Sequence, residues 1–127
     1  MQYQCVIPLR DGKDALEEIM RTCEHEGMQS VLGILKVFGP VKSPGLLSFP
    51  RPGITLAMDF PNQGAPTLDL LEKLDRIVLT AGGAVYPAKD ARMSPASFKR
   101  FFPNWELLES FRDPKFSSSF WRRVTKG

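Results

Sequence analysis

The alternation of apolar and polar positions predicts three β-strands in residues 1–61. Residues 3–9 (YQCVIPL) alternate and favour extended structure, which predicts the first strand. A second apolar run covers residues 30–40, and we expect this strand to be longer and more buried than the first. Residues 54–61 (ITLAMDFP) predict a third strand. We expect a loop at 41–53, because its prolines and glycines prevent regular pairing.

Helical periodicity follows the first and third strands. Between residues 11 and 27 the apolar side chains at helical spacing are Leu16, Ile19, Met20 and Cys23. Gly27 then marks the end of this helix. After the turn NQGAP, Thr67 can cap a second helix, whose apolar side contains Leu70, Leu74, Ile77, Val78 and Ala81. The pair Gly82-Gly83 ends this helix, and residues 84–87 predict a short fourth strand.

This β-α-β-β-α-β order predicts an α+β fold of the ferredoxin-like type, an antiparallel sheet with two helices on one face. A short-helical C-terminal tail follows, starting at Ser94-Pro95 and divided by Pro103 and Pro114. The tail is the most aromatic part of the chain: Phe98, Phe101, Phe102, Trp105, Phe111, Phe116, Phe120 and Trp121. We expect it to need a surface that the small sheet domain does not supply.

Strand parity assigns the side chains to the two faces of the predicted sheet. If Tyr3, Cys5 and Ile7 face the helices, the opposite face carries Gln4, Val6, Thr55, Ala57 and Asp59. Lys36 belongs on that opposite face, because an unpaired ammonium group is costly to bury beneath helices. Its neighbours there are Leu32, Ile34 and Phe38. Such a face is too apolar for water, so we expect a partner chain, another domain or a ligand to cover it.

The composition is that of one globular domain of 127 residues with a net charge of +3. The chain has no apolar run of about 18 residues, which excludes a membrane-spanning helix within it. It also lacks the pattern of a signal peptide, so we expect a cytoplasmic location. Residues 86–127 carry nine Lys and Arg against four Asp and Glu. A phosphate or acidic partner and solvated helix faces explain this excess equally well.

Motifs for several kinds of chemistry are missing. The sequence contains no P-loop, GxGxxG, GxSxG or HExxH pattern. Cys5 and Cys23 lack the spacing of metal ligands, so we expect two buried thiols and no metal site. ILKVFGP does not match the aromatic signature of RNA-recognition modules, so we expect no nucleic-acid partner. Lys36 and Lys89 remain as candidates, and a surface lysine or a simple ion pair is the alternative interpretation of each.

Seven motifs follow one another along the chain: YQCVIP (3–8), LKVFGP (35–40), LSFPRPG (47–53), MDFP (58–61), LDRIVLTAGGAVYPAKDAR (74–92), FFPNWE (101–106) and DPKFSSSFWRR (113–123). Together they resemble the C-terminal part of FAD-linked oxidoreductases of the vanillyl-alcohol-oxidase type. Within this family the resemblance is closest to the decaprenylphosphoryl-β-D-ribose 2′-oxidases, and it covers essentially the whole chain.

The resemblance implies a division into two parts. Residues 1–85 would form the second half of the substrate (cap) domain. Residues 86–127 would pack on an FAD-binding domain that is absent from this chain. The chain would then be a C-terminal fragment, inactive alone, of an enzyme that oxidises a secondary alcohol of a sugar or sugar-lipid by hydride transfer to FAD. If the substrate is a polyprenyl-phosphate sugar, the full enzyme would associate peripherally with a membrane.

The resemblance also implies roles for individual residues. Lys89 matches a lysine that reaches the flavin ring and is needed for activity, where a cation stabilises the negative charge of the reduced ring. Tyr86 matches a tyrosine beside the flavin. Lys36 matches a lysine of the substrate pocket, Phe38 an apolar wall of that pocket, and Gln4 one of its polar residues.

Two positions of the implied substrate pocket depart from the family pattern. Ala57 and Thr55 stand where the mycobacterial ribose oxidases have a cysteine and an asparagine, so we expect a different sugar or lipid tail to fit here.

A second hypothesis for the function of the chain involves no flavin. In it, the chain is a stand-alone ferredoxin-like ligand-binding or interaction module, with a self-contained tail and a dimer formed through the uncovered sheet face.

Overall fold

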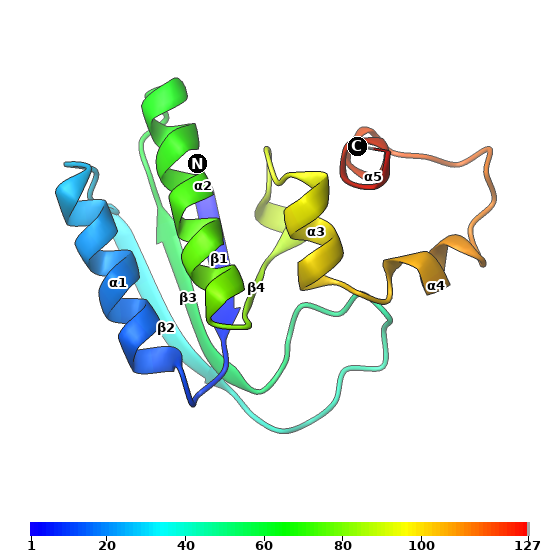
Figure 1. Ribbon diagram of the computed structural model, residues 1–127, viewed down its shortest axis with the longest axis horizontal. Coiled ribbons are helices and arrows are strands. Elements are labelled where there is room, and N and C mark those ends of the chain that lie inside the picture. The colour runs from blue at the N-terminus through cyan, green and yellow to red at the C-terminus, as the bar shows by residue number, and fades with distance from the viewer. Residues whose placement is uncertain (127) are drawn as a thin grey trace.

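The computed structural model describes residues 1–126, which form a four-stranded sheet, two helices packed on one of its faces, and a helical tail (Figure 1). The elements of the sheet domain are β1 (Gln2–Ile7), α1 (Gly12–His25), β2 (Leu32–Phe38), β3 (Gly53–Asp59), α2 (Ala65–Thr80) and β4 (Ala84–Val85). The strands lie in the order β2-β3-β1-β4, and each neighbouring pair is antiparallel. The predicted ferredoxin-like α+β fold is therefore confirmed.

The core lies between the sheet and the two helices. Ile19 of α1, Leu74 of α2 and Ile7 of β1 are fully buried in it. The helical periodicity placed Met20 with this set, but its side chain is exposed. Ala15 is buried instead, one turn before Ile19, so the buried side of α1 is rotated slightly from the predicted one.

The second helix begins at Ala65, two residues before the predicted cap. Thr67 is buried within its first turn, and its hydroxyl donates to the carbonyl of Pro61 (3.0 Å) and accepts from the amide of Gln63 (2.9 Å). The helix ends at Thr80, just before the predicted glycine pair, and the φ of 67° at Gly82 favours glycine. A Cβ on Gly83 would lie 2.4 Å from the carbonyl oxygen of Val6, so only glycine allows this close approach to β1.

The prediction that the second strand is buried is wrong. β2 is an edge strand, and six of its seven residues are exposed. Its apolar side chains point to both faces, and no strand among residues 1–126 lies beyond it. A continuous apolar run indicates a strand without specifying whether that strand is central or at an edge.

The tail contains the short turn η1 (Pro87–Lys89) and three helices, α3 (Pro95–Phe101), α4 (Trp105–Glu109) and α5 (Ser119–Thr125). The predicted helix start at Ser94 is confirmed, because its hydroxyl accepts from the amide of Ser97 at 3.1 Å. Figure 1 shows the tail beyond α2, with the loop between β2 and β3 running beside it.

Much of the aromatic content of the tail is buried inside the chain itself. Phe98 lies at the centre, with its ring centroid 5.4 Å from Phe102, 5.7 Å from Phe120 and 6.0 Å from Trp121. The expectation that the tail needs an external surface is therefore wrong for these residues. Phe111 and Phe116 remain exposed by about three quarters of their surface. No helix among residues 1–126 is long and apolar enough to cross a bilayer.

The central position of Phe98 leads to a first prediction. Phe98→Ala leaves a cavity among three aromatic side chains, those of Phe102, Phe120 and Trp121, and should lower the free energy of unfolding by about 3–5 kcal/mol. Phe116→Ala makes the same chemical change at an exposed site and should change it by less than about 0.5 kcal/mol. Urea denaturation followed by tryptophan fluorescence measures both, since Trp105 and Trp121 both lie in the tail. Equal losses from the two variants would contradict a buried tail core.

Glu109 gives the tail a defined dependence on pH. The Arg112 guanidinium holds the pKa of Glu109 down at about 2, and the indole of Trp121 also donates to this carboxylate at 2.8 Å. A carboxyl pKa below its unfolded value of about 4.3 adds stability above that pH, which is lost as the pH falls toward 2. The indole N–H resonance of Trp121 should therefore shift below pH 4. A shift centred on pH 4.3 would contradict the assignment, and Trp105 serves as the internal control.

Candidate functional site

The sheet register confirms the predicted division into two faces. Gln4 lies opposite Ala57, and Ala57 lies opposite Ile34 on the next strand. Thr55 lies between Val6 and Lys36 in the same way. Directly opposite residues of antiparallel strands point to the same face. Gln4, Thr55, Ala57 and Lys36 therefore share the face away from α1 and α2, which we call the open face.

A hydrogen bond connects two of the predicted pocket residues on the open face. The side-chain amide of Gln4 donates to the hydroxyl of Thr55 at 3.0 Å. Thr55 is only 2% exposed, whereas Gln4 and Ala57 are half-buried and Lys36 is exposed. The buried Thr55 hydroxyl therefore orients the Gln4 side chain, and Gln4 is the member of the pair that a ligand on the open face can reach.

An aromatic row crosses one end of the open face. Phe49, from the loop between β2 and β3, stacks on Tyr86 with ring centroids 4.7 Å apart and planes inclined by 28°. It also meets Phe38 edge-on at 6.1 Å. Val6 and Thr55, whose side chains point to the same face, are buried. The face predicted to be uncovered is thus partly covered by the chain's own loop.

Lys89 lies at the β4 side of this arrangement. Together with Gln4 and Tyr86 it lines a crevice of about 10 Å³, roughly the space of one water molecule. The Lys89 side chain is half-buried, and it has no hydrogen bond or ion pair with any residue in 1–126. The structure therefore brings Lys89, Tyr86 and Gln4 together, with Thr55, Ala57, Lys36 and Phe38 on the adjoining open face.

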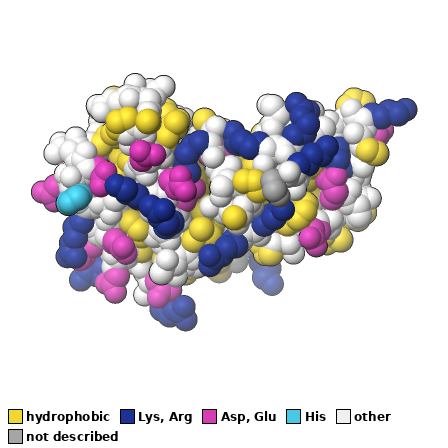
Figure 2. Space-filling view, turned by 45° about the horizontal axis from the view of Figure 1, so that its top comes forward, with side chains coloured by type: hydrophobic (Ala, Val, Ile, Leu, Met, Phe, Trp, Pro, Cys, Tyr) yellow, Lys and Arg dark blue, Asp and Glu magenta, His cyan; other side chains and the backbone are white. Residues whose placement is uncertain are grey.

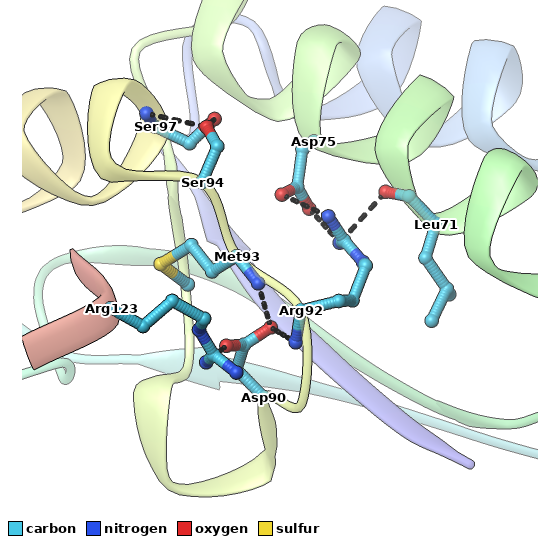
Figure 3. Close-up of polar contacts among 8 residues, drawn as sticks. All are labelled: Leu71, Asp75, Asp90, Arg92, Met93, Ser94, Ser97 and Arg123. Atoms are coloured by element: carbon cyan, nitrogen blue, oxygen red, sulfur yellow. Dashed lines mark hydrogen bonds and ion pairs between the residues drawn. The ribbon is translucent and has the colours of Figure 1, made fainter. Parts of the chain in front are cut away.

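The residues that follow Lys89 are fixed by buried ion pairs (Figure 3). Arg92 donates to both carboxylate oxygens of Asp75 on α2, at 2.7 and 2.8 Å, and to the carbonyl of Leu71 at 2.9 Å. Asp75 is 2% exposed. Burial raises the pKa of the Asp75 carboxyl, and the Arg92 guanidinium opposes this shift. A two-pronged pair of this kind fixes both position and orientation.

Asp90 holds the same segment from its other side. Its side chain is 3% exposed and accepts from the backbone amides of Arg92 (3.1 Å) and Met93 (2.8 Å). Its second oxygen accepts from Arg123 of α5 at 2.6 Å, and Arg123 also donates to the carbonyl of Ala91 at 2.6 Å. In the motif KDAR, the aspartate and the arginine therefore have structural partners, whereas Lys89 has none in the described chain.

Two buried groups on the helix-covered face have raised pKa values. Cys5 and Cys23 are free and buried, which confirms the prediction of two buried thiols, and burial raises the pKa of the Cys5 thiol to about 12. Burial also raises the pKa of Tyr3, whose hydroxyl has no hydrogen-bond partner among residues 1–126 although it lies near Asp75. Neither group reaches the open face.

Sequence reasoning missed three residues that build this site. Phe49 lies in the loop motif LSFPRPG, where an aromatic residue between prolines and glycines was the available signal. Asp90 and Arg92 lie in the quoted motif beside Lys89, but their partners Asp75 and Arg123 are distant in the sequence. Only the folded chain identifies those partners.

The charged side chains on the surface are distributed as the composition of the two parts of the chain predicts. In Figure 2, acidic and basic side chains mix over the half that holds the sheet and its helices, and basic ones predominate over the half that holds the tail. This agrees with nine Lys and Arg against four Asp and Glu in residues 86–127. The basic surface thus belongs to the part of the chain that the resemblance places against another domain.

No family model matches the sequence, but comparisons with known proteins find relatives of this chain. The chain is 37% identical over 111 residues to an uncharacterized protein in the mprA 5′ region of Streptomyces coelicolor, which covers 87% of this chain and 29% of that protein. It is 34% identical over 129 residues to the decaprenylphosphoryl-beta-D-ribose oxidase of Mycolicibacterium smegmatis, which covers 98% of this chain and 27% of that oxidase. The chain thus spans less than a third of the length of either relative.

Asp90 has buried partners and its neighbour Lys89 has none among residues 1–126, so the two residues should contribute differently to the free energy of unfolding. Asp90→Ala removes a buried acceptor from three donors and should lower the free energy of unfolding by about 1–3 kcal/mol. Lys89→Ala removes a side chain without partners and should change it by less than about 0.5 kcal/mol. Urea denaturation of the two variants measures both values. A loss from Lys89→Ala as large as that from Asp90→Ala would mean that Lys89 is a structural residue.

Proposed function

We propose that the chain is the C-terminal part of an FAD-dependent oxidoreductase that oxidises a secondary alcohol of a sugar or sugar-lipid. The observation that carries this proposal is the gathering of Lys89, Tyr86 and Gln4 around one crevice beside the open face. Similarity to an oxidase along 98% of the chain supports it. Residues 1–85 would form half of the substrate domain, and residues 86–127 would pack against the FAD-binding domain.

The residues of the crevice fit one edge of a flavin ring rather than a whole FAD. Lys89 offers an ammonium group without a competing carboxylate in the described chain, and Tyr86 offers a ring held by stacking on Phe49. A crevice of about 10 Å³ cannot contain the ring, which would instead rest against this surface. The phosphates and the adenosine of FAD would then be bound by the remainder of the longer protein.

Within such an enzyme FAD supplies the hydride acceptor, and this chain supplies charge and orientation. The Lys89 ammonium places positive charge where negative charge builds up during the reaction. Gln4 uses an amide proton to bind Thr55, which leaves its carbonyl oxygen available to accept from a substrate hydroxyl. The stack of Tyr86 on Phe49 keeps water from one end of the open face.

The open face suits a substrate with both charged and apolar parts. Lys36 is exposed on this face and would attract a phosphate group. Ile34 and Phe38 lie on the same face on either side of it and would contact a lipid chain. A polyprenyl-phosphate sugar combines these features, and binding it would bring the full enzyme to a membrane surface on the cytoplasmic side.

One observation favours the second candidate function, a stand-alone ligand-binding or interaction module. Phe98, Phe101, Phe102 and Trp121 are buried within the chain, as a self-contained tail requires. The exposed Phe111 and Phe116 and the partner-free Lys89 favour the flavoenzyme proposal instead, since each would have a function beside an FAD-binding domain.

The role of Lys89 leads to a prediction about the longer protein that contains the FAD-binding domain. Lys89→Ala should slow reduction of the flavin by substrate about 10²–10³-fold, because a preorganised charge is lost at the reacting ring. Stopped-flow absorbance of the flavin measures this rate. Lys13→Ala, which removes a lysine from the exposed side of α1, is the matched control and should leave the rate unchanged. A near-normal rate in Lys89→Ala would exclude the proposed role.

The isolated chain provides a second test of the same proposal. Because it would contribute only one edge of the flavin site, it should neither bind FAD tightly nor oxidise a sugar substrate. Titration of FAD with the purified chain, followed by flavin fluorescence, measures the binding. Tight binding together with turnover would contradict the proposal that the chain is a fragment.

A further inference from the structure

The turn that carries Lys89 is held at its first end by the sheet. The backbone amide of Tyr86 donates to the carbonyl of Gln4 on β1 at 2.8 Å. Within the turn, the amide of Lys89 donates to the carbonyl of Tyr86 and the amide of Asp90 donates to the carbonyl of Pro87, each at 3.2 Å. These bonds fix where the turn begins, and the position of its second end depends on other contacts.

That second end is held by α5. Asp90 directly follows Lys89, and its carboxylate accepts from Arg123 at 2.6 Å, although the two residues are 33 positions apart in the sequence (Figure 3). The Asp90 side chain is buried, and Arg123 is its ion-pair partner in the described chain. The guanidinium of Arg92 is occupied by Asp75. The charge that keeps the Asp90 carboxylate stable out of water therefore comes from Arg123.

The tail core gives Arg123 a defined position. Trp121 of the same helix is buried, and its ring centroid lies 6.0 Å from that of Phe98. The Arg123 guanidinium lies 5.6 Å from the centre of the Phe120 ring, within the range of a cation–π contact. Arg123 thus connects the buried core of the tail to the turn that carries Lys89.

We propose that Arg123 is a positioning residue for Lys89: acting through Asp90, it holds the turn so that the Lys89 ammonium group stays in the crevice with Tyr86 and Gln4. The inference rests on the proposed function, because it takes the action of Lys89 on a flavin as its premise. Without Arg123, the Asp90 carboxylate would be a buried charge without its partner, and it would turn toward water. The backbone of Lys89 would move with it, and a displacement of about 1 Å can slow a reaction about 10²-fold.

The pair of Arg92 and Asp75 does not replace this link. Arg92 lies three residues after Lys89 and is bound to α2, so it limits the path of the chain beyond the turn. Asp90 is the residue directly bonded to Lys89 along the backbone. The contact between Asp90 and Arg123 is therefore the one that acts on the orientation of Lys89 itself.

Amide hydrogen exchange in the purified chain tests the link without any cofactor. The backbone amides of Arg92 and Met93 donate to Asp90. If Arg123 keeps Asp90 in place, Arg123→Gln should speed the exchange of these two amides about tenfold or more, because the local structure opens more often. The amide of Phe102, which bonds within the tail core, should exchange as before.

The matched control for this exchange experiment is Arg122→Gln. Arg122 is the neighbouring arginine of α5, and its side chain donates to the carbonyl of Ser117 instead. This variant should leave the exchange at Arg92 and Met93 unchanged. The proposal is overturned if Arg123→Gln leaves it unchanged too. It is also overturned if Arg123→Gln speeds exchange throughout the tail core, since Arg123 would then support the whole tail.

A double-mutant cycle in the longer protein tests whether Arg123 acts through Lys89. Lys89→Gln and Arg123→Gln should each make the midpoint potential of FAD more negative, and Arg123→Gln should slow flavin reduction about 10–100-fold. Arg123→Lys, which keeps the positive charge, should restore part of both. In the Lys89→Gln background, Arg123→Gln should change neither quantity further, because the effects of coupled residues do not add.

The results of the cycle separate this inference from the function on which it rests. If Lys89→Gln leaves the potential unchanged, the proposed function and the role of Arg123 are both overturned. If Lys89→Gln shifts the potential but Arg123→Gln does not, or if the two shifts add, the proposed function stands and only the positioning role of Arg123 is overturned.

Discussion

Two buried carboxylates, Asp75 and Asp90, determine how the sheet domain, the tail and Lys89 are arranged. Asp75 fixes Arg92 against α2, and Asp90 connects the chain after the turn to Arg123 of α5. Ion pairs removed from water add little net stability, but removing one partner leaves an uncompensated charge. Such pairs therefore specify geometry. Here they set the path of the residues that carry Lys89 past Gln4 and Tyr86.

The sequence predicted the features that depend on local periodicity. The face of each strand residue followed from the period of two, which is why Gln4, Thr55, Ala57 and Lys36 were correctly grouped. Position within the sheet is not a local property. For this reason an apolar run such as LGILKVF indicated a strand but gave a wrong expectation of burial.

Contacts between distant segments account for what the sequence left undetermined. The tail was expected to need a foreign surface, yet Phe98 packs against Trp121 within the chain, and the motif alone does not reveal that pairing. Similarly, Phe49 reaches Tyr86 only because the loop between β2 and β3 folds back over the open face. The expected roles of the site residues came from a family resemblance. The structure adds that Asp90 has buried hydrogen-bond partners, whereas the Lys89 side chain has none in the described residues.

The central claim is that Lys89 is a free cation presented to a flavin ring. The midpoint potential of FAD in the longer protein tests this claim most directly, because a cation beside the ring stabilises the negatively charged reduced form. Lys89→Gln, which keeps much of the side-chain length but loses the charge, should make the potential more negative than in the unmodified protein. An unchanged potential would contradict the claim, since the charge of Lys89 would then not act on the flavin.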